Sequence, residues 1–196
     1  MQPFVPILMG SRADLPHAQA VATALEELGV AVDIRVGSAH KTPAHLLALI
    51  EAYEADPRPK VYITIAGRSN ALSGFVDAQV SAPVIACPPV SDAFGGADIF
   101  SSVRMPSGVA PALVLDPAGA ALLAAKILGL VDRAVRERVM ATQKRAVERI
   151  LSDDASLVTS DEGVEVGDGQ PFQNESFLEA THAPISDLCQ SSSKTS

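Results

Sequence analysis

The sequence predicts an α/β protein of three layers, in which a doubly wound, parallel, flavodoxin-like sheet is covered on both faces by helices and a long C-terminal helix follows. Two observations lead to this fold. Between residues 3 and 152, five short runs rich in β-branched residues alternate with segments of helical periodicity. Parallel strands need crossover connections, and right-handed crossovers bring the helices back onto the sheet. The 196 residues, 47% of them apolar, suffice for one core.

The first half of this pattern contains three strands and two helices. The strands are expected over residues 3–9, 31–36 and 60–66. An Ala-rich helix over 15–29 joins the first two and ends at Gly29. The second helix, over 43–55, begins with Thr42 as N-cap and Pro43 at its first position, where the N–H that Pro lacks would have no partner anyway.

The second half continues the alternation. A short helix is expected over about 70–80, and strands over 83–87 and 111–115. The irregular segment between those strands contains a helical turn near "GADIFSSVR". Asp116 and Pro117 then begin a long helical stretch that reaches residue 151 and is predicted to break near Gly129.

The charge of the chain separates a domain from a tail. Residues 1–152 contain 14 acidic and 14 basic side chains, whereas residues 153–196 contain 9 acidic and 1 basic. We therefore expect one folded domain over 1–152 and an acidic tail over 153–196 that is extended or disordered. An alternative is that residues 171–185 dock on a neighbouring subunit. A neutral domain without a basic stripe argues against a nucleic-acid partner.

Cysteines and histidines provide no metal site and no disulfide framework. Cys87 lies in an apolar run and Cys189 in the tail, so we expect a reduced, cytoplasmic protein. No apolar run approaches the ~20 residues that a membrane helix needs. Cys87 could be a nucleophile, but no local base is visible, which favours a buried hydrophobic role. His17 and His45 are expected on helices, as packing or surface residues, and His182 in the tail.

Candidate site residues follow the strands directly. Ligands of open parallel sheets bind beyond the carboxyl ends of the strands. The first four strands are followed by "MGSRAD", "GSAHKTP", "AGRSNALSG" and "CPPVSDAFGG". Each combines Gly or Pro with small hydroxyl or charged residues, but none is a dinucleotide or ATP motif. We therefore expect a small ligand, held without a nucleotide cofactor or a metal.

The first loop places Ser11 and Asp14 beside a helix start, where backbone N–H groups favour an oxyanion. Asp14 could equally be no more than the cap of that helix. In the third loop, Arg68 could form a structural ion pair, and Ser69 and Asn70 could cap the next helix.

The second loop combines a phosphate-binding pattern with a candidate base. Lys41 as a point charge and Ser38 as a hydroxyl donor suit a phosphate, although a surface lysine is more often only solvated. His40 stands between them. Its unperturbed pKa near ~6.5 lets a neutral imidazole accept and return a proton near neutral pH.

These loops, in order and spacing, resemble the phosphoribosylaminoimidazole carboxylases and mutases of purine biosynthesis. The resemblance rests on the segments "MGSRAD", "SAHKTP", "AGRSN", "CPP" and "SSVRMPSG" and covers residues 4 to about 150. One branch of that family carries a His-containing segment after the third strand and rearranges an N-carboxylated substrate. The other carries "AGRSN" and carboxylates aminoimidazole ribonucleotide directly with CO2. This sequence is similar to the carboxylase branch.

The resemblance implies a role for each candidate. His40 would be the general acid and base, and ribose and phosphate would be held by Ser11, Asp14, Ser38 and Lys41. The CO2 pocket would be formed by Gly67, Ser69, Asn70 and Ala71. Further contacts are expected from Arg12, Arg68, Arg104 and Ser107, the last two in a loop that closes over the ligand. Ala13 departs from the family, which often has Ser there, so Arg12 would supply any missing phosphate contact.

The same resemblance implies no cofactor and a homo-oligomer, usually an octamer, with the helix over 117–151 buried between subunits. It leaves tetramer and octamer open. Alternatives are the mutase, a related carboxylase acting on a nicotinate nucleotide, and a non-catalytic nucleotide-binding module.

Overall fold

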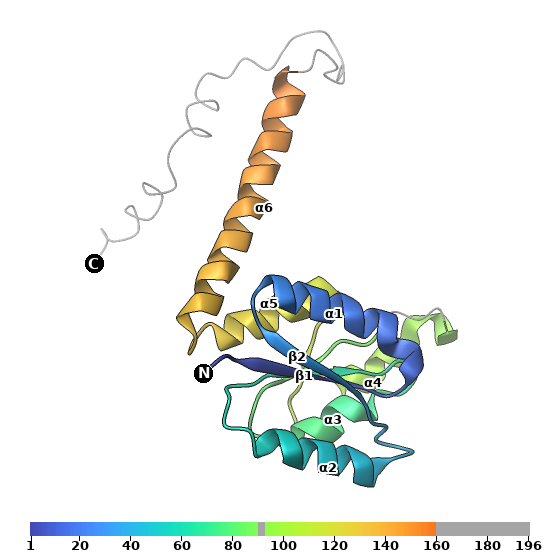
Figure 1. The fold of residues 1–196 in the computed structure, drawn as a ribbon. Helices are drawn as coiled ribbons and strands as arrows, with labels where there is room; N and C mark the ends of the chain where they lie inside the picture. Colours follow the sequence, from blue (N-terminus) through green and yellow to red (C-terminus); the bar gives the residue numbers. More distant parts are fainter. Residues whose placement is uncertain (90–92, 160–196) are drawn as a thin grey trace, which may run out of the picture. The chain divides into compact units, whose positions relative to one another are not determined.

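The computed structural model describes residues 1–89 and 93–159 of the chain. Within these residues, five strands form one parallel sheet in the order β2-β1-β3-β4-β5 (Figure 1). The strands are β1 (Phe4–Met9), β2 (Ala31–Val36), β3 (Tyr62–Ile65), β4 (Val84–Ala86) and β5 (Ala112–Leu113). The chain moves from β1 to one side and then passes to the other, so the strand order reverses between β1 and β3. The predicted flavodoxin-like fold is confirmed.

Helices cover both faces of this sheet. They are α1 (Leu15–Glu27), α2 (Pro43–Glu54), α3 (Ala71–Asp77), α4 (Phe100–Val103), α5 (Pro117–Leu128) and α6 (Arg133–Thr159), with 3-10 turns η1 (Arg12–Asp14) and η2 (Ala93–Ile99). Buried residues of α1 and α5 share one hydrophobic cluster with the sheet, and those of α2 and α3 share the other (Figure 1). The sheet is therefore the middle layer of three.

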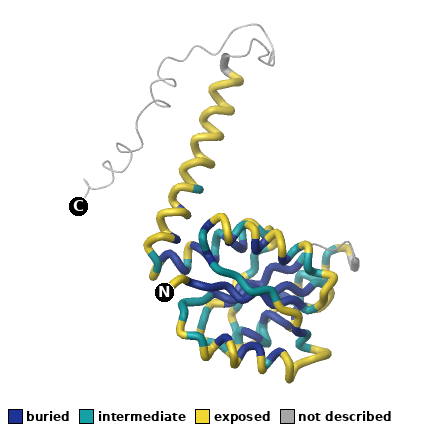
Figure 2. The backbone as a smooth tube through the Cα atoms, in the orientation of Figure 1, coloured by how far each residue is buried: buried dark blue, intermediate teal, exposed yellow. Residues whose placement is uncertain are grey.

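Strand β1 shows why the strand sequences are continuously apolar. Val5 and Ile7 belong to the cluster beneath α1 and α5, whereas Phe4 and Leu8 belong to the cluster beneath α2 and α3. Successive side chains alternate between the two faces, and both faces are covered. All six residues of β1 are accordingly buried, as the dark centre of Figure 2 shows.

The predicted helix breaks occur at glycines. Helix α1 ends just before Gly29, whose φ of 72° is a left-handed conformation that glycine adopts without strain. The long C-terminal helix is broken at Gly129, as predicted, because α5 ends at Leu128 and α6 begins only at Arg133. The Arg136 side chain donates to the Gly129 carbonyl over 2.7 Å and satisfies one of the last carbonyl groups of α5.

The structure corrects the expected boundary of the tail. Helix α6 continues to Thr159, although an extended tail was expected from residue 153. The segment 153–159 contains neither Gly nor Pro, so its acidic side chains do not interrupt the helix. The compact unit that contains the sheet ends at a similar place, since it comprises Met1–Arg149. Residues 160–196, including His182, Cys189 and the 171–185 segment, lie outside the described residues.

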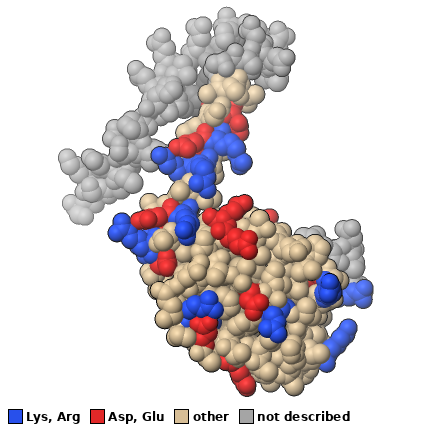
Figure 3. Space-filling model, viewed as in Figure 1, with Lys and Arg blue, Asp and Glu red and all other residues tan. Residues whose placement is uncertain are grey.

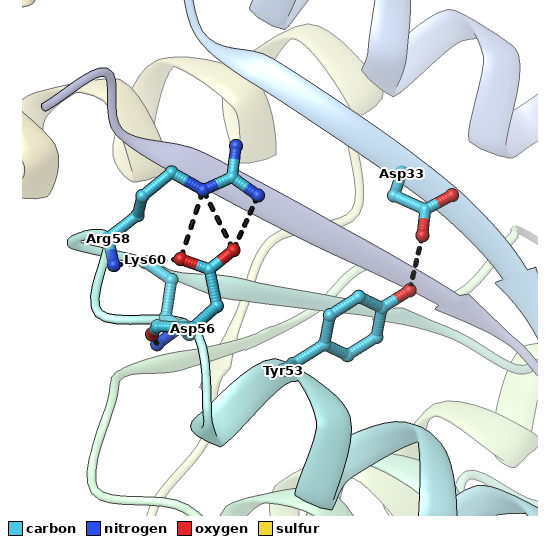
Figure 4. A network of polar contacts seen from close by, with 5 residues as sticks. All are labelled: Asp33, Tyr53, Asp56, Arg58 and Lys60. Atoms are coloured by element: carbon cyan, nitrogen blue, oxygen red, sulfur yellow. Dashed lines mark hydrogen bonds and ion pairs between the residues drawn. The ribbon is translucent and has the colours of Figure 1, made fainter.

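A network of polar side chains lies near the amino-terminal ends of the strands (Figure 4). The Tyr53 hydroxyl donates to Asp33 over 2.7 Å. Arg58 pairs with Asp56 over 2.6 Å and lies 4.2 Å from the centre of the Phe4 ring. Hydrogen bonds from Arg58 lower the pKa of Asp56 to about 2. The polar groups of this edge are thus satisfied internally.

Candidate active site

A cavity of about 410 Å³ opens at the carboxyl ends of β1, β2 and β3, where the strand order reverses. Its lining consists of Gly10, Ser11, Ala13, Asp14, Ser38, Ala39, His40, Lys41, Ala66, Gly67, Arg68, Ser69 and Leu72. Two bonds hold the three loops side by side: Gly10 N–H donates to the Ile65 carbonyl and Gly37 N–H to the Met9 carbonyl, each over 2.8 Å. Loops far apart in sequence therefore form one site.

The loop after β1 brings Ser11 and Asp14 to the cavity. The Ser11 hydroxyl accepts from the Ala13 N–H over 3.2 Å and begins the η1 turn. Asp14 occupies the N-cap position of α1, but its side chain makes no capping hydrogen bond. The Asp14 side chain therefore does not act as the cap of α1, and a contact from it to a ligand stays a prediction.

The electrostatics of Asp14 agree with this interpretation. Desolvation raises the pKa of its carboxyl above the usual 3.8, and a hydrogen bond from the Ser11 backbone and the charge of His17 lower it in part. The ionised carboxylate is therefore held at a cost to the folded protein without a bound ligand. Carboxyl groups with a pKa shifted by desolvation are typical of binding and catalytic sites.

The loop after β2 is stiffened by its own hydroxyl groups. The Thr42 hydroxyl accepts from the Ser38 N–H over 3.0 Å, and the Ser38 hydroxyl accepts from the Lys41 N–H over 3.2 Å. Thr42 thus fixes the loop instead of capping α2 through its side chain. The Ser38 hydroxyl keeps its proton to donate, and the exposed His40 and Lys41 line the cavity beside it.

The loop after β3 divides its residues between the cavity and the protein interior. Gly67, Arg68 and Ser69 line the cavity, and Arg68 has no ion pair with any of the described residues. Asn70 is only 1% exposed and does not line the cavity. Its side chain caps α3 by accepting from the Ser73 N–H over 3.2 Å, which is the helix-cap interpretation of this residue.

Asn70 also connects this loop to the segment around α4. Its amide nitrogen donates to the Ser102 hydroxyl, and its backbone N–H donates to the Ser101 hydroxyl, each over 2.9 Å. The backbone N–H of Asn70 is therefore already used inside the protein. This connection spans about thirty residues and has no signal in the sequence.

The remaining predicted contacts lie outside the cavity lining. Ala71, the first residue of α3, is exposed and does not line the cavity. Arg12, Arg104 and Ser107 are exposed and none of them lines the cavity in this structure. Conversely, the cavity gains an apolar wall from Ala39, Ala66 and Leu72, which chemistry-bearing motifs alone do not reveal.

A base lies beside Cys87, although the sequence shows none nearby. The imidazole Nε2 of His17 is 3.3 Å from the Cys87 Sγ, across 70 residues of sequence. Burial, with a smaller effect from Asp116, raises the pKa of the Cys87 thiol to about 12. The thiol is fully buried and stays protonated, which agrees with the hydrophobic role expected for it.

Acidic and basic side chains are interspersed on the face of the molecule that Figure 3 displays. Over the described ranges, no group of three or more His, Cys, Asp or Glu side chains is arranged to hold a metal ion. Nor does any helix in that part of the chain combine the length and apolarity needed to cross a membrane.

Comparison with known proteins identifies the family to which this chain belongs. Residues 4–149 match the model of the family described as AIR carboxylase. This chain belongs to the AIR carboxylase family. It is 54% identical to phosphoribosylaminoimidazole carboxylase from Treponema denticola, over 80% of this chain and 99% of that protein. The same enzyme of Archaeoglobus fulgidus is 53% identical, over 77% of this chain and 83% of that protein.

Longer relatives and a solved structure extend this family assignment. The mouse bifunctional phosphoribosylaminoimidazole carboxylase/phosphoribosylaminoimidazole succinocarboxamide synthetase is 39% identical over 70% of this chain, which spans 32% of that longer protein. The crystal structure of Treponema denticola PurE superposes with a TM-score of 0.79 and covers 80% of this chain and 99% of that one. Residues 4–149, which match the family model, contain all five strands of the described sheet and the residues that line the cavity.

Proposed function

We propose that this member of the family carboxylates C4 of 5-aminoimidazole ribonucleotide with CO2, reversibly and without ATP, as a step of purine biosynthesis. The observation that carries the proposal is the cavity at the strand-order reversal, whose lining includes Ser38, His40 and Lys41 as well as Asp14. A phosphate-binding group, a proton-transfer group and a carboxylate suited to sugar hydroxyls thus line one pocket. Its volume of about 410 Å³ suits a mononucleotide.

The loops suggest how the nucleotide is oriented. Lys41 and the Ser38 hydroxyl bind the phosphate, because an ammonium and a hydroxyl donor complement its oxygens. Asp14 accepts from the ribose hydroxyls, and Ser11 contributes from the same loop. Gly67 and Ser69, which line the same cavity from the loop after β3, are then left for the imidazole ring and the incoming CO2.

The substrate supplies most of the reactivity. Aminoimidazole is an enamine, so electrons from its exocyclic nitrogen make C4 nucleophilic. C4 attacks the carbon of CO2, a carbon–carbon bond forms, and one C=O π pair moves onto oxygen to give the carboxylate. The enzyme needs to hold the two reactants at the right angle, which can contribute several kcal/mol to lowering the barrier.

His40 completes the reaction. The intermediate carries both hydrogen and carboxylate on a tetrahedral C4. Neutral His40 removes that proton, the C–H electron pair returns to the ring, and aromaticity is restored. In the reverse direction the imidazolium protonates C4 and CO2 leaves. A placed base of this kind contributes roughly 10²- to 10⁴-fold in rate.

The first experiment mixes the protein with aminoimidazole ribonucleotide and bicarbonate, without ATP, and follows the carboxylated product by ultraviolet absorbance. We expect turnover that rises with dissolved CO2. Turnover of the N-carboxylated nucleotide alone would instead indicate the mutase. Turnover of a nicotinate nucleotide would indicate the related carboxylase, and binding without any turnover would indicate a binding module.

The second experiment replaces His40 with Asn. We expect kcat to fall by about 10²- to 10⁴-fold while the dissociation constant for aminoimidazole ribonucleotide is retained. The matched control is His45→Asn, because His45 is exposed on α2 and does not line the cavity. Full activity in His40→Asn would remove this residue from the mechanism.

We further infer that the protein is a cytoplasmic homo-oligomer, a tetramer or an octamer, with a catalytic domain over 1–152 and an acidic tail beyond the end of α6. Large apolar side chains stay exposed at Phe100 and Val103 of α4, at 63% and 52%, and at Leu130 between α5 and α6, at 74%. Such surfaces are typical of interfaces between subunits. Light scattering after gel filtration would measure the assembly, and a monomer would contradict it.

A further inference from the structure

A contact between an imidazole and a thiol lies at the carboxyl ends of the strands, outside the residues that line the cavity. The Nε2 atom of His17 is 3.3 Å from the Sγ atom of Cys87. His17 is half-buried in the first turn of α1, and Cys87 is fully buried directly after β4. Neither residue lines the cavity, and the proposed reaction uses neither. The contact therefore needs an explanation other than direct catalysis.

The thiol can hold the imidazole through a chain of two hydrogen bonds. Burial raises the pKa of the Cys87 thiol to about 12, so the sulfur keeps its proton at neutral pH. The Leu115 carbonyl oxygen, 3.7 Å from Sγ, accepts from this S–H. A sulfur that donates in this way can still accept from the His17 Nε2–H. The first turn of α1 is thereby tied to the segments that follow β4 and β5.

His17 is a neighbour of Asp14, which does line the cavity. Asp14 is the N-cap of α1 and His17 is its third residue, and side chains three positions apart lie on the same face of a helix. Desolvation raises the pKa of Asp14, and a backbone hydrogen bond from Ser11 and the charge of His17 lower it in part. Within the described residues, no hydrogen bond or ion pair joins the two side chains. His17 therefore acts on Asp14 through its charge and leaves the carboxylate oxygens to a ligand.

No other cation takes this part. Among the residues that the structure describes, no Lys or Arg forms an ion pair with Asp14. A second carboxylate, Asp116, acts on the Cys87 thiol, but it already caps α5 by accepting from the Gly119 N–H over 2.6 Å. The carboxylate that is left for His17 to balance is the one that lines the cavity.

We propose that His17, anchored by Cys87, is a positioning residue whose charge steadies the Asp14 carboxylate for the ribose hydroxyls of the nucleotide. The inference rests on the proposed function, which makes those hydroxyls the ligand of Asp14. No covalent bond forms or breaks at His17 or Cys87. The pair instead lowers the cost of holding an ionised, partly desolvated carboxylate before the nucleotide binds.

The first test is His17→Gln, which keeps an N–H donor for Cys87 and removes the charge. The assay is run at pH 6, where imidazole side chains are mostly charged. At saturating CO2, we expect the KM for aminoimidazole ribonucleotide to rise about 3- to 30-fold while kcat stays within about twofold, because uniform binding is lost. The matched control is His45→Gln, since His45 is exposed on α2 and does not line the cavity. An equal rise in KM for His45→Gln would mean a general charge effect and would overturn the proposal.

A double-mutant cycle separates positioning from a structural role. In an Asp14→Asn background the charge of His17 has no carboxylate to act on, so adding His17→Gln should change the KM by less than about twofold. A merely structural role would raise the KM equally in both backgrounds. Equal effects therefore overturn the proposal.

The anchor is tested by two replacements of Cys87. Cys87→Ala removes the partner of His17, and we expect the nucleotide KM to rise as in His17→Gln. Cys87→Ser keeps a donor and an acceptor at the same position and should restore the KM to near the wild-type value. A wild-type KM in Cys87→Ala, or the same rise in Cys87→Ser, contradicts the anchoring role.

Calorimetry without substrate distinguishes this inference from the proposed function. At pH 6, His17→Gln should lower the Tm in the wild-type background and lower it less in Asp14→Asn, where no carboxylate needs the charge. This coupling without any nucleotide turnover would contradict the proposed function and leave an electrostatic pair. Turnover by the wild type with additive effects on both Tm and KM would keep the proposed function and reject the role of His17.

Discussion

Replacement of Asp14 by Asn is expected to stabilise the protein without its ligand and to weaken substrate binding. Desolvation raises the pKa of this carboxyl in the folded state above its usual 3.8. The folded protein therefore holds the Asp14 proton more tightly than the unfolded chain does. The stability linked to this proton is complete below about pH 3.8 and is lost as the pH rises through the folded-state pKa. At neutral pH the ionised carboxylate lowers the free energy of unfolding, and Asn removes that cost.

Two measurements follow for Asp14→Asn. By calorimetry without ligand, the Tm at pH 7 should exceed that of the wild type, and the difference should shrink towards pH 4. In the carboxylation assay, the KM for the nucleotide should rise by about 10- to 100-fold, because a hydrogen bond to a charged group contributes roughly 1.5–3 kcal/mol. A lower Tm at pH 7 would refute the reasoning, since it would mean that the carboxylate anchors the fold.

Asp116 provides the matched control for this prediction. It is the N-cap of α5, and its carboxylate accepts from the Gly119 N–H over 2.6 Å. Asp116→Ala should therefore lower stability by ~1 kcal/mol, or about 2–4 °C in Tm for a chain of this size. Asp14→Ala should not, because Asp14 makes no capping bond. Equal losses in both variants would show that Asp14 is a cap after all.

Three further predictions concern the fold around the site. Tyr53→Phe removes a 2.7 Å hydrogen bond to Asp33 and should lower the free energy of unfolding, measured in urea, by about 1–3 kcal/mol. We expect kcat to stay unchanged. A loss of kcat would show that this network affects the site at the other end of the strands. Asn70→Ala removes the cap of the Ser73 N–H and a buried bond, and should cost about 1–3 kcal/mol; wild-type stability would refute its structural role. Burial raises the pKa of the Cys87 thiol to about 12, so iodoacetamide should not modify it in the native protein at pH 8. After unfolding, peptide mass spectrometry should show that Cys87 is labelled. Labelling in the native state would contradict its burial.

The fold could be predicted because each local signal agrees with the sheet. The strands are continuous apolar runs, since helices cover both faces, and glycines stand where α1 ends and where α5 breaks from α6. The length of α6 was underestimated, because acidic composition was taken as a sign of disorder although no Gly or Pro interrupts the helix before Thr159. Composition predicts solvation better than it predicts backbone conformation.

Residues of the candidate site could be predicted only where polar or proton-transferring side chains directly follow a strand in the sequence. Ser38, His40 and Lys41 follow a strand directly, and the structure places them in the cavity. The contact between His17 and Cys87 could not be predicted, since 70 residues separate them and no sequence motif contains both. Contacts of this kind depend on which helix covers which strand end, and periodicity does not determine that.

Polar side chains are paired at the amino-terminal ends of the strands and are less fully paired at the carboxyl ends. At the amino-terminal edge Asp56 is paired with Arg58, and Tyr62 donates to Glu54 over 2.8 Å. At the carboxyl edge Asp14 makes no capping bond, and Arg68 has no ion pair within the described part of the chain. A fold selected for stability alone would satisfy both ends of the strands, since a partly desolvated carboxylate such as Asp14 lowers stability when it is ionised. Polar groups that are available to bind a ligand explain the difference. The end of the strands with fewer internal polar contacts is therefore the end where we propose that the reaction takes place.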